Sequence, residues 1–331
     1  MTTRVTDPER IKRLTEEAEV LRSESLWTKA FRRLRQDRLT MMSIATILVL
    51  SLLALAAPLI TRALDVNPNA TDAFNNFLPV CNPFAEQYTT NASGIQVENE
   101  AWLSCQRGNY LGTDNLGRDH LARLLYGGQI SLAIGFSAAF VTVFIGLTFG
   151  MIVGYFGGIV DDIMNWVITT LNSIPSLYLL IAISAIFSPT PWALVFIFAV
   201  TGWTGDTRLV RGQTLQIRDL EYVVAARALG ASPARIMRVH VFPNIISVLV
   251  VSLAISVGGI ILAESALSFL SLGVQPPTAT WGNMLTDAQD YFQSGAFHLA
   301  LFPGLLISIT VLCMYVIGDG IRDAFDPTTV D

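Results

Sequence analysis

Lysine is almost absent from this chain of 331 residues, in which Lys12 and Lys29 are the only two. Charged residues are also scarce: they make up 14% of the sequence, against roughly 25% in a typical soluble protein, while hydrophobic residues make up 52%. This balance indicates a membrane protein and excludes a disordered chain. The formal net charge of −5 lacks the basic excess of nucleic-acid-binding proteins, so no nucleic acid partner is expected.

The scarcity of lysine excludes nucleotide hydrolysis by this chain alone. A phosphate-binding loop needs Gly-x-x-x-x-Gly-Lys-Ser/Thr, and neither lysine has that context. The chain also lacks the Gly-x-Ser-x-Gly and His-Glu-x-x-His motifs of hydrolases. Its histidines, His120, His240 and His298, lie too far apart in sequence to predict a metal site. We therefore expect no enzyme and no cofactor in this chain, and a membrane-anchored enzyme is the least supported alternative.

Long apolar runs predict six transmembrane helices and an all-α polytopic membrane protein. The first run, 39–60, contains no charge, and its 22 residues cover about 33 Å as a helix, enough to cross a hydrocarbon core of about 30 Å. The five further spans are expected at 130–154, 163–187, 192–205, 245–272 and 299–318. The fourth of the six spans, 192–205, is short and is expected to continue to about residue 210.

A signal peptide is the alternative for the first run, because Ala54-Leu55-Ala56 resembles a cleavage site. The charged leader over 1–38 is too long for a signal peptide, and the apolar run exceeds the usual 7–15 residues. We therefore expect a retained helix. The mixture of apolar residues with charges of both signs in the leader predicts an amphipathic helix that contacts lipid.

Basic residues predict the orientation of the spans. With both termini cytoplasmic, 17 of the 21 Lys and Arg residues fall in cytoplasmic segments, as the positive-inside rule requires. The expected organisation is therefore a cytoplasmic leader over 1–38, the helix 39–60, an extracytoplasmic loop over 61–129, a core of five helices over 130–318 and a cytoplasmic tail over 319–331. A cytoplasmic loop over 206–244 interrupts the core.

This orientation decides which cysteines are exposed to an oxidising compartment. Cys81 and Cys105 both fall in the outer loop, 24 positions apart, whereas Cys313 lies in the last span. In an oxidising compartment the first two are expected to form a disulfide. The alternative is two unpaired thiols, and the spacing does not suit a metal site.

The cytoplasmic loop has the pattern of two short helices joined at a corner. Residues 219–229 are rich in helix formers, and Gly230 can end that helix in a left-handed conformation. Ser232 and Pro233 are typical of the start of a second helix, which Pro243 is expected to end. Such a knob would suit the groove of a partner. The alternative is a plain connecting loop with solvated arginines.

The same loop resembles the signature loop of ABC importer permeases, Glu-Ala-Ala-x3-Gly-x9-Ile-x-Leu-Pro. Ala225, Ala226, Gly230 and Pro243 match this pattern. Three positions depart from the pattern: Val224 stands in place of its Glu, His240 in place of its Ile and Phe242 in place of its Leu.

Three further stretches resemble the oligopeptide/dipeptide/nickel branch of that family, and specifically its C-type subunit. They are Leu-Gly-Thr-Asp-Asn-Leu-Gly-Arg-Asp at 111–119, Leu-Gly-Val-Gln-Pro-Pro-Thr-Ala-Thr-Trp-Gly-Asn-Met at 272–284, and Gly-Asp-Gly-Ile-Arg-Asp-Ala-Phe-Asp-Pro at 318–327. The resemblance covers roughly 30–327. It is interrupted at about 80–108, which has the character of an insertion and contains both outer cysteines.

The resemblance implies a type I ABC importer permease fold, in a prokaryotic plasma (inner) membrane. The chain would form half of the pathway for di- or oligopeptides that an extracytoplasmic binding protein delivers. Its partners would be a second, B-type permease and two ABC ATPases, which would hold the ATP and Mg. The cytoplasmic loop over 206–244 would then be the coupling loop, in which Ala225, Ala226 and Gly230 would permit close approach of an ATPase.

Arginines of the coupling loop have two open interpretations. Arg227, Arg235 and Arg238 either meet carboxylates of the ATPase or are solvated surface residues.

Two positions within the spans bear on transport. Glu264 is the only acid well inside an expected span, and such an acid must face a partner or a wet cavity because burying it in lipid costs about 2.5–3.5 kcal/mol. It either lines the pathway or makes a packing hydrogen bond. Pro175 is expected to kink the third span, beside the pathway or for packing alone. An ion- or proton-coupled secondary transporter or channel, with Glu264 as its site, is the alternative function.

Overall fold

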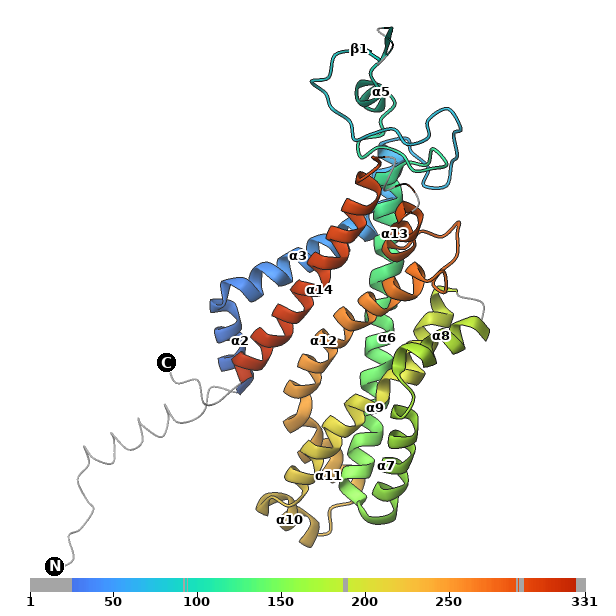
Figure 1. Cartoon of the computed structure of the whole chain (residues 1–331). Helices are drawn as coiled ribbons and strands as arrows, with labels where there is room; N and C mark the ends of the chain where they lie inside the picture. The colour runs from blue at the N-terminus through green and yellow to red at the C-terminus, as the bar shows by residue number, and fades with distance from the viewer. Residues whose placement is uncertain are drawn as a thin grey trace, which may run out of the picture.

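The computed structural model is a bundle of long helices with an irregular segment at one end (Figure 1). It describes residues 26–91, 93, 95–186, 190–289, 291 and 295–325. The first 25 residues of the expected leader and the last six of the expected tail lie outside the described residues. The described elements, in chain order, are α2 Leu26–Gln36, α3 Arg38–Leu55, α4 Ala57–Ala63, β1 Tyr88–Thr90, β2 Gln96–Glu98, α5 Glu100–Gln106, α6 His120–Phe156, α7 Gly158–Asn172, α8 Ser176–Ile186, α9 Pro191–Arg218, α10 Glu221–Ala228, α11 Pro233–Ile236, the π-helix η1 Met237–Val241, α12 Phe242–Phe269, α13 Trp281–Gln289 and α14 His298–Phe325.

Long apolar helices dominate the described chain. Four of them, α3, α6, α9 and α14, are each long and apolar enough to cross a membrane, and the continuous run from α11 through α12 is a fifth. The pair α7 and α8 makes a sixth span if its two bent halves are counted as one. The all-α polytopic fold that the sequence predicts is therefore confirmed.

The first two spans differ in detail from the expected ones. The run 39–60 is broken at Ala56 into α3 and α4, because Pro58 in the first turn of α4 has no N–H to continue the bonds of α3. The second span begins at His120 rather than at residue 130. Asp119 caps its start by accepting the N–H of Ala122 at 2.7 Å, a local signal that hydropathy does not detect.

The third and fourth spans also depart from the expected bounds. The third is interrupted at Ser173–Pro175, where α7 and α8 meet at a bend of 80°, so the kink expected at Pro175 is a complete break. The fourth extends over all of α9, to Arg218. The loop expected over 206–244 therefore begins inside a helix, whose buried positions Val210, Thr214 and Ile217 recur at helical spacing.

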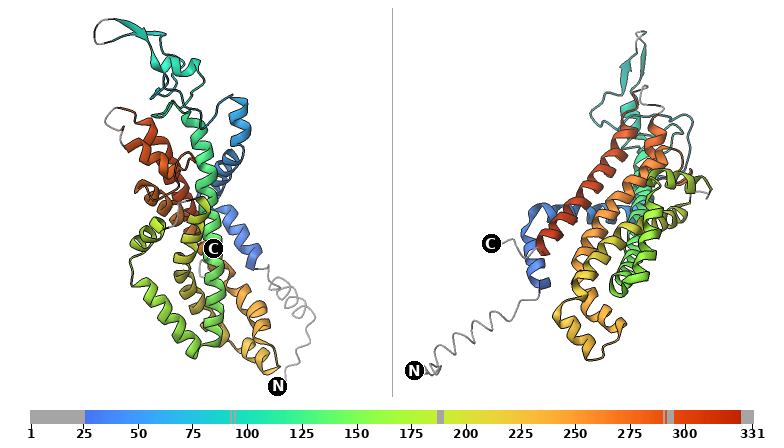
Figure 2. Two further views of the ribbon diagram at one scale, coloured as in Figure 1. Left: turned by 90° about the vertical axis from the view of Figure 1, so that its right-hand side faces the viewer. Right: turned by 60° about the horizontal axis from the view of Figure 1, so that its bottom comes forward.

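Helix α6 is the central element and runs nearly the full length of the bundle (Figures 1 and 2). It packs closely against α9 through Gly146, Gly150 and Gly154. A Cβ atom at Gly150 would lie 2.6 Å from Val210, so only glycine allows the two helices this contact. The core continues on the other side of α6, where α12, α14 and α3 pack.

The irregular segment over 64–119 lies at one end of the bundle, and α10 lies at the other (Figure 1). We call these the loop end and the α10 end. The segment contains the antiparallel pair β1 and β2, with Thr89 opposite Val97, and the short helix α5. Helix α13, which is too short to span a membrane, packs against α6, α12 and α14 near the loop end.

Candidate docking site and cavity

The candidate docking site is α10 and the turn that follows it. Gly230 has a φ of +87°, and the N–H groups of Gly230 and Ala231 donate to the carbonyls of Arg227 and Ala226 at 3.0 Å. These two bonds form a Schellman motif, which ends a helix and satisfies its last carbonyls. A side chain at Gly230 would meet no atom within 4 Å, so the backbone conformation, and not space, favours glycine here.

The chain after this turn enters the membrane span without a second break. Ser232 caps α11 by accepting the N–H of Arg235, and Pro233 occupies the first turn. The expectation that Pro243 ends this helix is wrong, because α11, η1 and α12 form one continuous rod. The wider π-turn, in which Phe242 donates to Met237, accommodates the proline ring that a regular helix would exclude.

Helix α10 packs on the bundle through a buried apolar side chain and also carries exposed apolar side chains. Val223 is fully buried with Ile236 and Val241 in a core cluster that also contains residues of α6, α9 and α12. Leu229, at the end of α10, is 89% exposed, and Tyr222 and Val224 are about half exposed. An apolar patch on a rigid support is typical of a protein-docking surface.

The structure places the predicted coupling residues at this one end, in different surroundings. Ala225 is exposed and Ala226 is half-buried on α10. The guanidinium of Arg227 lies 5.4 Å from the ring centre of Tyr155 on α6, within cation–π range. Arg235 and Arg238 are exposed, as is Pro243.

Polar contacts tie the base of the knob to two long helices. The Asn244 amide of α12 donates to the Tyr222 hydroxyl at 3.3 Å. Nη1 of Arg218, at the end of α9, donates to the carbonyl of Gly154 on α6 at 3.0 Å. Helix α10 is therefore bonded directly to α12, and it packs with α6 and α9 through the shared apolar cluster.

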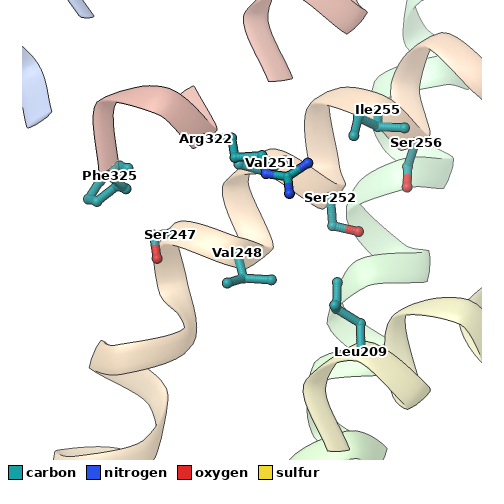
Figure 3. A pocket seen from close by; sticks show the side chains of 9 residues that line it. All are labelled: Leu209, Ser247, Val248, Val251, Ser252, Ile255, Ser256, Arg322 and Phe325. Atoms are coloured by element: carbon teal, nitrogen blue, oxygen red, sulfur yellow. The ribbon is translucent and has the colours of Figure 1, made fainter. Parts of the chain in front are cut away.

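A cavity of about 550 Å³ opens between α9, α12 and the end of α14 (Figure 3). The guanidinium of Arg322 reaches over α12 beside Val251 and Ser252, and Leu209 closes the side of α9. The Ser252 hydroxyl donates to the buried carboxylate of Asp206 on α9. The remaining lining residues are Ser247, Val248, Ile255, Ser256 and Phe325.

Glu264 and Pro175, both predicted near the pathway, do not line this cavity. Glu264 is fully buried, and its Oε1 accepts the Ser268 hydroxyl at 2.8 Å. Helix α13 covers it so closely that a Cβ atom at Gly282 would lie 3.1 Å from its Oε2. Pro175 is exposed at the break between α7 and α8.

At the loop end, Cys81 and Cys105 form a disulfide with their Cα atoms 4.7 Å apart. Sequence reasoning missed a second feature there, a cluster in which the buried Asp114, Arg118 and Arg123 meet the half-buried Asp287 of α13. The feature in the sequence that could have indicated this cluster is the group of charged residues in the 111–119 motif, which directly precedes an apolar run. Within the described residues, no group of three or more His, Cys, Asp or Glu could hold a metal ion.

Many apolar helices, a knob with an exposed apolar surface and a cavity beside it define a membrane protein of the transport class. The family model of the binding-protein-dependent transport system inner membrane component matches residues 146–331, and that of the N-terminal TM domain of oligopeptide transport permease C matches residues 25–79.

Curated relatives agree with the family models. The dipeptide transport system permease protein DppC of Bacillus subtilis (strain 168) is 38% identical over 250 residues, which are 76% of this chain and 77% of that protein. The oligopeptide transport system permease protein OppC of Escherichia coli (strain K12) is 33% identical over 319 residues, 96% of each chain. A solved chain of the inward-facing MetNI methionine ABC transporter superposes with a TM-score of 0.48 and 22% identity, over 61% of this chain and 95% of that one. By its sequence matches, the chain belongs to the family of inner membrane components of binding-protein-dependent transport systems.

Proposed function

We propose that this chain is the C-type permease subunit of an ATP-driven importer of di- or oligopeptides. It pairs with a B-type permease, and the two together enclose the pathway to which the cavity in Figure 3 belongs. Two ABC ATPases bind below, and they carry the ATP and Mg. An extracytoplasmic protein delivers the peptide. The relatives named for dipeptide and oligopeptide transport support this substrate class.

The observation that carries the proposal is the α10 knob. Its exposed Val224 and Leu229 offer an apolar docking surface, and its buried Val223 packs with residues of α6, α9 and α12. Moving a two-state equilibrium from 1:99 to 99:1 needs about 5.5 kcal/mol of differential interaction. A flexible loop could move without moving the spans. A helix that is capped and packed on a buried core moves together with the spans on which it packs.

The orientation follows from charge. Seventeen of the 21 Lys and Arg residues lie in segments that the proposal assigns to the cytoplasm, together with both termini and the α10 end. The loop end then faces the oxidising side, where the disulfide of Cys81 and Cys105 is stable.

A secondary transporter with Glu264 as its ion site is less well supported. The carboxylate is fully buried beneath α13 and lies outside the lining of the large cavity. An ion-coupled carrier also has no need of an exposed apolar knob.

The test is reconstitution of the permease pair with its ATPases and binding protein in proteoliposomes. We expect uptake of a radiolabelled dipeptide that requires ATP and stops when the nucleotide-binding lysine of the ATPases is replaced. Addition of ionophores should leave it unchanged. Uptake that follows an ion gradient in the absence of ATP would contradict the proposal and favour the carrier. A nickel chelate taken up in place of the peptide would contradict the substrate class alone.

A further inference from the structure

The loop end contains an ion cluster in which Asp114, Arg118 and Arg123 are buried, whereas the Asp287 side chain is 32% exposed. Nε of Arg118 lies 2.6 Å from Oδ2 of Asp114, and Nε of Arg123 lies 3.4 Å from the same oxygen. Both arginines also face Oδ2 of Asp287 on α13, at 3.4 Å from Arg118 and 3.9 Å from Arg123. The Arg123 side chain is 1% exposed. Two cations are thus shared between a carboxylate of the loop segment and one of α13.

Unpaired polar atoms surround a small space in the same cluster. Among the described residues, Nη1 and Nη2 of Arg123, both ring nitrogens of His120 and Oδ1 of Asn115 have no hydrogen-bond partner although they are buried. These three residues line a cavity of about 10 Å³ together with Asp287. That volume and that number of polar groups suit one water molecule, which would complete the cluster.

One side of the cluster belongs to the irregular loop segment, which is firmly packed there. The N–H of Thr113 donates to the carbonyl of Leu78 at 3.0 Å, and Nε2 of His298 lies 3.4 Å from the Thr113 carbonyl. The Phe77 ring packs on Tyr291 with centres 4.6 Å apart. A displacement of the loop segment would therefore move Asp114 and Arg118 with it.

The other side of the cluster belongs to α13, whose two ends are held differently. At its start, the Trp281 indole N–H donates to the carbonyl of Leu124 at 3.0 Å, and the Trp281 backbone N–H donates to Ser131 at 3.1 Å. Near its end, Asp287 contacts Arg118 of the loop segment and Arg123 in the first turn of α6. Between them Gly282 lies directly on Glu264 and on α12, a helix that lines the large cavity.

We propose that Arg118, Arg123 and Asp287 form a relay that transmits the position of the outer loop segment 64–119 to α13 and hence to α12. The inference rests on the proposed function, in which the binding protein contacts the loop end. Arg118 and Arg123 are positioning residues: they act through Asp287 and touch no peptide. The cluster suits this task because loss of the Asp287 carboxylate leaves two buried arginines with Asp114 as their one remaining carboxylate in the cluster.

The experiment uses the complete transporter in proteoliposomes and compares basal ATPase activity with the activity that the peptide-loaded binding protein stimulates. Asp287→Asn keeps the shape of the side chain and removes its charge. We expect it to lower the stimulation about fivefold or more, the range of a typical coupling between sites, while basal activity and binding-protein affinity stay within about twofold. Asp287→Glu, which restores the charge, should recover most of the stimulation.

A matched control is Asp65→Asn, which removes an exposed carboxylate at the same end whose positive φ of 53° asparagine tolerates. It should leave the stimulation unchanged. Full stimulation in Asp287→Asn overturns the relay, and so does a parallel loss of basal activity and assembly, which would indicate a purely structural role. A double-mutant cycle of Arg123→Gln with Asp287→Asn adds a further test, because independent effects would contradict a shared path. Failure of the wild type to respond to the binding protein would contradict the proposed function itself.

Discussion

The two ends of the bundle use opposite chemistry. At the α10 end, apolar side chains are buried beneath a capped helix and further apolar side chains are exposed on it. At the loop end, charged side chains are buried between the loop segment and α13, and a disulfide closes the segment outside. Under the two proposals above, this difference separates a docking surface at one end from a charge-linked contact between the loop segment and α13 at the other.

The largest effect is expected from Gly230→Val. Valine at a φ of +87° is strained by more than the roughly 1–2 kcal/mol of an ordinary residue, so the Schellman turn should be lost and α10 should tilt. We expect loss of uptake and of stimulated partner ATPase activity, measured in proteoliposomes. Gly108→Val is the matched control, because Gly108 has a φ of +76° and equally open space, but lies at the loop end. Undiminished uptake by the first variant would contradict the assignment of the knob.

A local effect is expected at the loop end when the disulfide is removed. Closing a loop of 24 positions stabilises the folded segment by about 3 kcal/mol, so Cys81→Ser with Cys105→Ser should increase opening about 100-fold. The rate of proteolysis between these positions measures it. Cys313→Ser, in α14, should leave the rate unchanged. Equal rates in all variants would mean that packing alone holds the segment.

A smaller effect is expected at Glu264, which lies within a membrane span between the two ends. Glu264→Ala leaves the Ser268 hydroxyl without its buried acceptor, at a cost of about 1–3 kcal/mol, and opens a space beneath α13. Glu264→Gln keeps an acceptor and should cost less. Thermal denaturation of the purified complex measures both. If instead the glutamine variant abolished uptake while remaining fully stable, the carboxylate would have a transport role and the packing interpretation would be wrong.

The smallest effect is expected at Arg227. Its exposed contact with Tyr155 is worth about 0.5–1 kcal/mol, so Arg227→Ala should weaken ATPase binding only a few-fold. Tyr155→Leu should have a similar effect, and Tyr155→Phe, which keeps the ring, almost none. In the double variant Arg227→Ala with Tyr155→Leu the losses should not add. Additive losses in a binding titration would show that Arg227 contacts the ATPase directly.

Much of the fold could be predicted because its signals are local. Uncharged runs of about 20 residues marked the spans, and Gly230 with Ser232 and Pro233 marked the corner of the knob. Bounds were predicted less well where capping and breaking residues outweigh hydropathy, as at Asp119 and Pro58. The continuity of α11 with α12 was missed because a π-turn that accommodates Pro243 leaves no simple pattern.

The residues proposed to be functional also divide into those that local sequence can identify and those that it cannot. A resemblance along the chain was enough to select the α10 segment, since its residues are consecutive. Arg118 and Asp287 are 169 positions apart and meet only through folding, so no local pattern predicts that contact. The sequence also left two interpretations of Glu264, and its position beneath Gly282 favours packing.

The sequence alone determined that this is a polytopic helical membrane protein whose Lys and Arg residues gather in a few segments between the spans, and that two short helices meet at a corner near residue 230. These conclusions depend on hydropathy, charge count and backbone preferences, which act over a few residues. The tertiary structure alone decided which charges are buried together, where the cavity opens and that α13 covers Glu264. Such facts depend on the packing of distant helices, which places a side chain in water or removes it from water.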